Sequence, residues 1–108
     1  MRLLECERTR ADLRVCVATD YGGDAIHVIE LTDGGATVTD SAPAGDGPVE
    51  PAVILDGARV LIASTGSLDG SLSLFRYDPS TRALQLAGTG PLPGCLRTRA
   101  SSRPQIWS

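Results

Sequence analysis

The residues whose types could do chemistry are few, and the main ones lie between positions 20 and 50. His27 is the only histidine in the 108-residue chain, and histidine is the side chain best suited to acid–base work near neutral pH. It lies in the alternating segment 25–31, so Ala25 and Ile29 share its face of a strand. Because no catalytic or metal-binding partner stands near it in the sequence, we expect a structural, hydrogen-bonded histidine, with a catalytic base as the alternative.

Three carboxylates are the other candidates. Asp20 and Asp24 flank Tyr-Gly-Gly in one loop, where two carboxylates and backbone carbonyls could hold Ca²⁺. The dense oxygen pattern of an EF-hand is missing, and aspartate is common in turns because its side chain bonds nearby backbone. We therefore expect turn-forming roles and no metal. Glu50, in a Pro/Gly loop, is the second catalytic candidate, but as a single carboxylate it is expected to be solvated. No cofactor is expected.

The elements that must position these side chains are β-strands. The 12 glycines and 7 prolines are spread along the chain, and no long stretch keeps a 3.6-residue apolar period. Short apolar or alternating runs between Gly, Pro and Asp turns predict strands. These runs cover residues 13–19, 25–31, 36–40, 52–55, 59–64, 71–77 and 83–87. One more strand could lie within residues 1–12, where charged residues obscure the pattern.

The order of strands and turns occurs twice. Arg59-Val-Leu-Ile-Ala-Ser64 repeats Arg14-Val-Cys-Val-Ala-Thr19 at an offset of 45 residues, and segment 71–77 repeats segment 25–31 at an offset of 46. A period of about 40–50 residues with about four strands is typical of a propeller blade. The sequence therefore predicts an all-β fold of antiparallel strands forming about two blades of a β-propeller. Residues 1–46 would be the first repeat and 47–94 the second. A small antiparallel β-sandwich is the alternative.

Two segments resemble the seven-bladed lactonase family of propellers, which includes 6-phosphogluconolactonases and shares YVTN-type repeats. Val17-Ala-Thr-Asp-Tyr-Gly-Gly-Asp-Ala-Ile-His-Val-Ile-Glu-Leu31 is similar to the blade pattern V-A-N-Y-G-G-G-S-V-S-V-F-x-L. Ser71-Leu-Ser-Leu-Phe-Arg-Tyr-Asp-Pro-Ser-Thr-Arg-Ala-Leu84 is similar to V-x-V-Y-R-x-D-P-x-T-G-x-L of a following blade. The resemblance covers residues 13–92 and implies a propeller fold and hydrolysis of a sugar lactone. Where the family has Pro-His-x-His, this chain has Pro48-Val-Glu-Pro51, without histidine.

Two blades alone leave exposed sheet edges that closure of a full ring would remove. We therefore expect the chain to associate with copies of itself, three or four for a ring, or to dock on another propeller fragment. A fragment of low stability is the third possibility. The function hypothesis is a partial lactonase-like propeller that is non-catalytic alone and acts as an interaction and assembly module. The alternative is a hydrolase of a sugar lactone, its ligand, once assembled into a full propeller.

Charge and hydropathy exclude other partners. The net charge is −3 and all ten basic residues are arginine, so the chain has no overall basic field for nucleic acid. No apolar run approaches membrane-spanning length, and the N-terminus lacks the apolar segment of a signal peptide. We expect a cytoplasmic protein without nucleic-acid or membrane partners. Residues 95–108, with three arginines and no acid, are expected to form a flexible tail.

Cysteine usage supports the same location. The three cysteines, Cys6, Cys16 and Cys95, are odd in number and widely spaced, which predicts no disulfide framework. Cys16 lies in an apolar run and is expected to be a small buried hydrophobic side chain.

Overall fold

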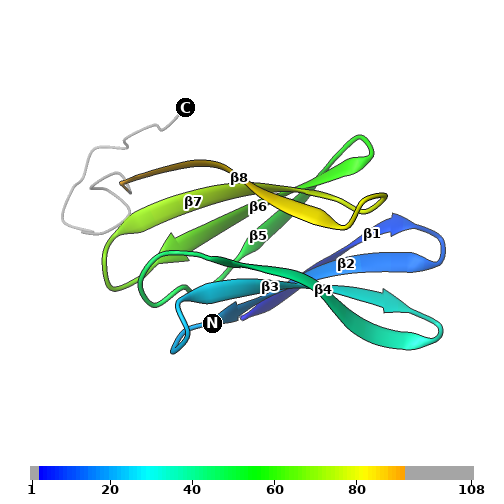
Figure 1. The fold of residues 1–108 in the computed structure, drawn as a ribbon, viewed down its shortest axis with the longest axis horizontal. Helices are drawn as coiled ribbons and strands as arrows, with labels where there is room; N and C mark the ends of the chain where they lie inside the picture. Colours follow the sequence, from blue (N-terminus) through cyan, green and yellow to red (C-terminus); the bar gives the residue numbers. More distant parts are fainter. Residues whose placement is uncertain (1–2, 92–108) are drawn as a thin grey trace, which may run out of the picture.

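The computed structural model describes residues 3–91, which form eight strands and no helix. The strands make two four-stranded antiparallel sheets, each paired in sequence order. The first sheet contains β1 (Leu4–Arg10), β2 (Leu13–Asp20), β3 (Ala25–Thr32) and β4 (Gly35–Pro43). The second contains β5 (Ala52–Asp56), β6 (Arg59–Gly66), β7 (Ser71–Asp78) and β8 (Ala83–Pro91). Figure 1 shows the two sheets packed against each other. The all-β prediction is confirmed, and both a pair of propeller blades and a small sandwich fit this arrangement.

The predicted repeats and the observed sheets have compatible limits. All strands of the first sheet lie within residues 1–46, and those of the second lie within 47–94. The predicted tail, 95–108, lies outside the described residues. Among residues 3–91, no helix has the length and apolar character needed to cross a membrane.

Local sequence explains the turns between strands. Gly35, with a φ of 133°, ends the tight turn in which Thr32 pairs with Gly35. In the β2–β3 loop the positive φ of 54° falls on Asp24, a conformation that aspartate tolerates better than most residues. Gly23 is needed there for space, because a Cβ would clash with the Asp20 carboxylate. The Asp20 Oδ1 accepts the Gly23 backbone N–H at 2.9 Å.

The second sheet repeats the first at an offset of 46 residues. Strands β6 and β7 begin and end 46 residues after β2 and β3. Each sheet has an irregularity between its third and fourth strands, at Val28/Ile29 and at Leu74/Phe75. The sequence match of β2 with β6 at 45 residues is therefore one residue off. Because strand side chains alternate, this shift exchanges the two faces of the strand.

The hydrophobic core lies between the two sheets. Equivalent strands face each other, because β1 contacts β5, β2 contacts β6 and β4 contacts β8. Each sheet contributes four side chains that are at most 1% exposed: Val15, Val17, Ile26 and Val28 from the first, and Val60, Ile62, Phe75 and Tyr77 from the second. Burying each of these contributes roughly 1.5–3 kcal/mol. One core therefore holds both repeats together.

A buried polar cluster joins the sheets beside this core. The Tyr77 hydroxyl donates to Glu30 Oε2 at 2.7 Å, and the Thr39 hydroxyl lies 2.7 Å from the Tyr77 oxygen. Arg82 Nη2 lies 3.3 Å from Glu30 Oε1, whose side chain is only 5% exposed. Burial, with the Glu30 carboxylate adding to it, raises the pKa of Tyr77 to about 12. The buried carboxylate thus has both a hydroxyl donor and a cation, as a charge away from water requires.

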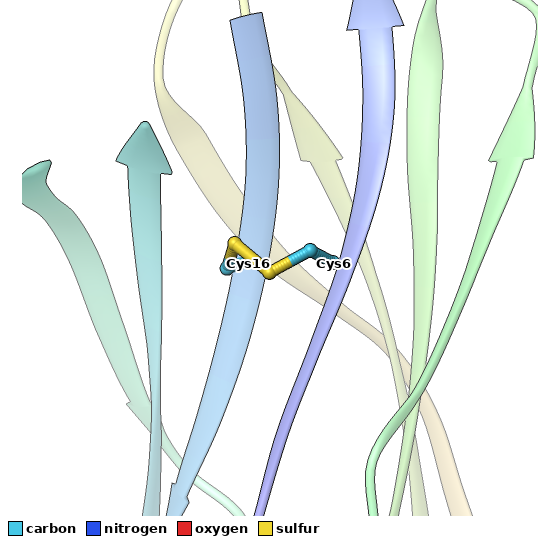
Figure 2. The surroundings of a disulfide bond; sticks show 2 residues. All are labelled: Cys6 and Cys16. Carbon is cyan, nitrogen blue, oxygen red and sulfur yellow. A yellow bond between two sulfur atoms is a disulfide. The ribbon is translucent and has the colours of Figure 1, made fainter. Parts of the chain in front are cut away.

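The prediction about the cysteines is wrong for two of the three. Cys6 in β1 and Cys16 in β2 are direct cross-strand partners and form a disulfide with a Cα–Cα distance of 4.0 Å (Figure 2). Cys16 is buried, as expected, but its thiol is not free. The pairing was not predicted because the charged residues of β1 obscure its strand pattern. Without that strand, the sequence gives no reason to place Cys6 opposite Cys16. Cys95 lies outside the described residues.

Candidate interaction surfaces

The outer face of the second sheet, pointing away from the core, is apolar over part of its area, and Arg59, Arg76 and Asp78 lie on the rest. We call it the β5–β8 outer face and define it by Ile54, Leu61, Ala63, Leu72 and Leu74. Ile54 is 59% exposed and Leu74 is 44% exposed. A groove of about 220 Å³ runs between β5, β6, β7 and β8, and Ile54, Leu61, Ala63 and Leu74 line it. Arg76, the cross-strand partner of Leu61, also lines it.

The outer face of the first sheet is also apolar along its middle. Register places Cys6, Cys16, Ile29 and Val38 in one row across all four strands, and we call the surface around this row the β1–β4 outer face. Leu4, paired with Ala18, extends it. Val38 is 60% exposed and Leu4 is 51% exposed. The disulfide therefore lies on the side of this face, with Cys16 itself only 1% exposed.

Exposed apolar surfaces of this kind mark interaction sites on proteins more often than scattered single residues do. The β1–β4 and β5–β8 outer faces lie on opposite sides of the molecule, because the inner faces of both sheets form the core. A flat apolar sheet face fits a second sheet, which packs about 10 Å away with interdigitating side chains. The geometry suits docking of β-sheet partners on both sides.

His27 lies at one end of the β1–β4 outer face, between two polar side chains. Its Nδ1 is 2.7 Å from Ser41 Oγ in β4, and its Nε2 is 3.6 Å from Asp20 Oδ2. The expectation that His27 has no triad-type partners is therefore corrected, although its hydrogen-bonded role agrees with the structure. Ser41 was missed because β4 continues to Pro43, beyond the predicted end at residue 40.

The composition of this row matches a catalytic triad, but its surroundings do not. The side chains of His27 and Asp20 are 35% and 48% exposed, on the open face of a sheet. Triad catalysis gains most from oxyanion donors fixed in a water-excluded site, and an open sheet face excludes little water. The row is suited to orienting His27 on the surface.

Asp24 hydrogen-bonds the connector between the two sheets at one end of the molecule. Its Oδ1 accepts the Gly47 backbone N–H at 2.9 Å, and Asp69 Oδ2 accepts the Asp46 backbone N–H at 3.1 Å. The connector between the sheets is thus held by one aspartate from each sheet. Partial desolvation and the nearby carboxylates of Asp24 and Asp69 raise the pKa of Asp46.

These contacts give the two aspartates of the predicted calcium loop separate tasks. Asp20 caps Gly23 and lies beside His27, whereas Asp24 caps Gly47. Within residues 3–91, no group of three or more His, Cys, Asp and Glu side chains is placed to hold a metal ion. Glu50 is exposed in the connector between β4 and β5, two residues before β5 begins, whereas His27 lies in β3 of the first sheet.

Comparison with known proteins adds no assignment. No family model, no curated protein and no solved structure matches this chain. The resemblance to lactonase propellers accordingly stays a prediction from the sequence, and the surfaces described above are the basis for proposing a function.

Proposed function

We propose that the chain is an interaction and assembly module, non-catalytic alone, whose two outer sheet faces each dock a β-sheet. The observation that carries the proposal is the pair of open apolar faces on opposite sides of one core. The row Cys6–Cys16–Ile29–Val38 crosses one of them, and the groove beside Ile54 and Leu74 crosses the other. Leaving this much apolar surface in water is unfavourable, and docking would remove it.

The repeat supports a partial propeller as the form of this module. Both sheets have the same strand order, and equivalent strands stack on each other. Stacked four-stranded sheets of this kind are the units of a propeller, whose ring closes when further units are added. Under this proposal the module is a pair of blade-like sheets, completed by its partner.

The test is crosslinking from the two faces in the cells that make the protein. A photoreactive phenylalanine analogue in place of Val38 or Leu74 is expected to give a covalent product of defined mass. The same analogue in place of Leu68, which is 62% exposed in the β6–β7 loop, is expected to give none. Folded protein without a product from either face would overturn the proposal.

A second candidate, hydrolysis of a sugar lactone, is favoured by one observation, the Ser41–His27–Asp20 row. In this hypothesis the Ser41 hydroxyl attacks the lactone carbonyl while His27 takes its proton. We expect the isolated chain to hydrolyse 6-phosphogluconolactone no faster than buffer. Hydrolysis that is lost in Ser41→Ala and kept in Ser80→Ala would establish the enzyme instead.

The disulfide links the redox state of Cys6 and Cys16 to the compartment in which the chain resides. A cytoplasmic location was expected from the cysteine pattern, but disulfides persist in oxidising compartments and are rare in the cytosol. We infer that Cys6–Cys16 is reduced if the chain remains in the cytoplasm. Alkylation of thiols in intact cells before lysis measures this, because only a reduced pair is modified.

A further inference from the structure

We propose that the partner of these faces is a second copy of this chain, docked head to tail. The β5–β8 outer face of one copy packs on the β1–β4 outer face of the next. This inference rests on the proposed assembly function and names its partner. It is drawn from the packing of the two sheets within one chain, which supplies a template for the contact between chains.

The template is directional. The β2–β3 and β6–β7 loops lie at the same end of the molecule, because Asp24 and Asp69 both bond the connector at residues 46–47. The β1–β2, β5–β6 and β7–β8 turns meet at the other end, where Arg10, Ala58 and Ser80 line one cavity. Figure 1 shows hairpin turns of both sheets at the same side. The second sheet is therefore the first sheet moved along the stacking direction, without being turned over.

This direction determines which faces are open. The face of the first sheet that is covered inside the chain corresponds, at the 46-residue offset, to the open face of the second sheet. Conversely, the covered face of the second sheet corresponds to the open face of the first. The open pair is thus the repeat equivalent of the pair that already forms the core. Placing a second copy in the same way would bring the two open faces together.

The side chains at the equivalent positions suit this contact. On the β5–β8 outer face, four aliphatic residues replace four core residues of the first sheet: Leu61 for Val15, Ala63 for Val17, Leu72 for Ile26 and Leu74 for Val28. On the β1–β4 outer face, three of the four replacements are apolar: Cys16 for Ile62, Ile29 for Phe75, Leu31 for Tyr77 and Arg14 for Val60. Arg14 lines a cavity together with Arg8, Asp12 and Asp33.

The buried ion pair has a counterpart with reversed charges. Within the chain, Arg82 from the β7–β8 turn reaches Glu30 of the first sheet. Arg76 stands 46 residues after Glu30, on the open face, and Asp33 lies in the β3–β4 turn that corresponds to the β7–β8 turn. In the head-to-tail contact, Asp33 of one copy therefore approaches Arg76 of the next. A cation meets an anion in both contacts, which gives the assembly electrostatic complementarity.

Head-to-tail docking makes a prediction that same-face docking does not. Leu74→Glu blocks the β5–β8 outer face and Val38→Glu blocks the β1–β4 outer face. By sedimentation, the unaltered chain is expected to be an oligomer, and each variant alone a folded monomer of 11.3 kDa. An equal mixture of the two variants is expected to form a 1:1 dimer through their intact faces. Leu68→Glu, with a more exposed leucine outside both faces, is expected to associate like the unaltered chain.

A charge exchange tests the contact without altering its apolar part. Asp33→Arg and Arg76→Asp are each expected to weaken self-association about tenfold, because each juxtaposes like charges. Mixing these two variants restores an opposite-charge pair at every contact and is expected to restore association.

The outcomes separate this inference from the proposed function. An unaltered chain that is a folded monomer, variants that each dimerise alone, or a mixture that stays monomeric would overturn the second copy as partner. If crosslinking from Val38 and Leu74 then identifies a different protein, the assembly function stands. If it yields no product, both proposals fail.

Discussion

The two sheets share topology and register yet stabilise their first strands by different means. In the second sheet, Val53 of β5 pairs with Ile62 of β6, and this pair faces the core, with Ile62 only 1% exposed. At the corresponding place in the first sheet, the pair is Cys6–Cys16, which faces outward. The two strands contact each other across the sheets, but only β1 is also joined covalently to its neighbour in the sheet.

The composition of the two edge strands follows from this difference. β1 is the longer strand, seven residues, with Glu7 and Arg8 exposed, while β5 has five residues, four of them apolar or alanine. Charges on an edge strand oppose unwanted pairing with another chain's edge. A strand rich in charge gains little from burial, and the crosslink to β2 ties this strand covalently to its sheet.

The largest expected effect distinguishes the inner from the outer faces. Ile26→Ala removes a side chain that is fully buried between the sheets, and we expect the free energy of unfolding to fall by about 2–5 kcal/mol. Leu72→Ala, at the equivalent position of the second sheet, should cost about 1 kcal/mol or less. Both are measured by urea unfolding in the Val38→Glu background, where no second copy can cover Leu72. Equal costs would mean that the two faces do not differ as described.

The next effect concerns the disulfide. Replacing both Cys6 and Cys16 by serine should lower the free energy of unfolding by about 2–3 kcal/mol, because the unfolded chain is no longer constrained over this short loop. Dithiothreitol should destabilise the unaltered chain by a similar amount and leave the double variant unchanged. Cys95→Ser is the control and should retain the sensitivity to dithiothreitol. A chain indifferent to the reductant would show that β1 does not depend on the crosslink.

The smallest effect concerns the polar junction between the sheets. The pKa of Tyr77, raised from 10.0 to about 12 by burial, means that the folded state keeps a proton which the unfolded state loses. Its contribution to stability is present below pH 10 and is lost as the pH rises to about 12, by up to about 2 kcal/mol. Tyr77→Phe should remove this part of the pH dependence, whereas Tyr21→Phe, at an exposed tyrosine, should not. Identical alkaline profiles for both variants would contradict the prediction.

Much of the fold was predictable because strand and turn signals are local. The runs at 13–19 and 25–31 lie inside β2 and β3 with ends differing by one residue, since β-branched residues between Gly and Asp turns specify strands by themselves. β1 was obscured because a charged edge strand lacks the apolar alternation of a half-buried one. Register depends on contacts between strands, which sequence similarity does not report. Matching Val15 with Val60 therefore predicted an offset of 45 residues, one fewer than the structural offset of 46.

The candidate surfaces depended on that register and were less accessible to sequence reasoning. Whether Leu74 faces the core or the solvent changes with a shift of a single residue, and no local pattern distinguishes the two. The Ser41–His27 contact was missed for a related reason, since the two residues are 14 positions apart and only strand pairing brings them together. His27, Asp20 and Asp24 lie close together in the sequence, but only the structure shows the partners of each.

The order of strand pairing has a consequence for how fast the chain folds. Every strand pairs only with its neighbour in sequence, so each sheet can form by successive closure of short hairpins, which takes microseconds for an isolated hairpin. The contact between Tyr77 and Glu30 across the sheets, by contrast, joins residues 47 positions apart, and such distant contacts slow folding. We expect docking of the two preformed meanders to be the rate-limiting step. Core substitutions at that interface would then affect the folding rate more than substitutions in the hairpin turns.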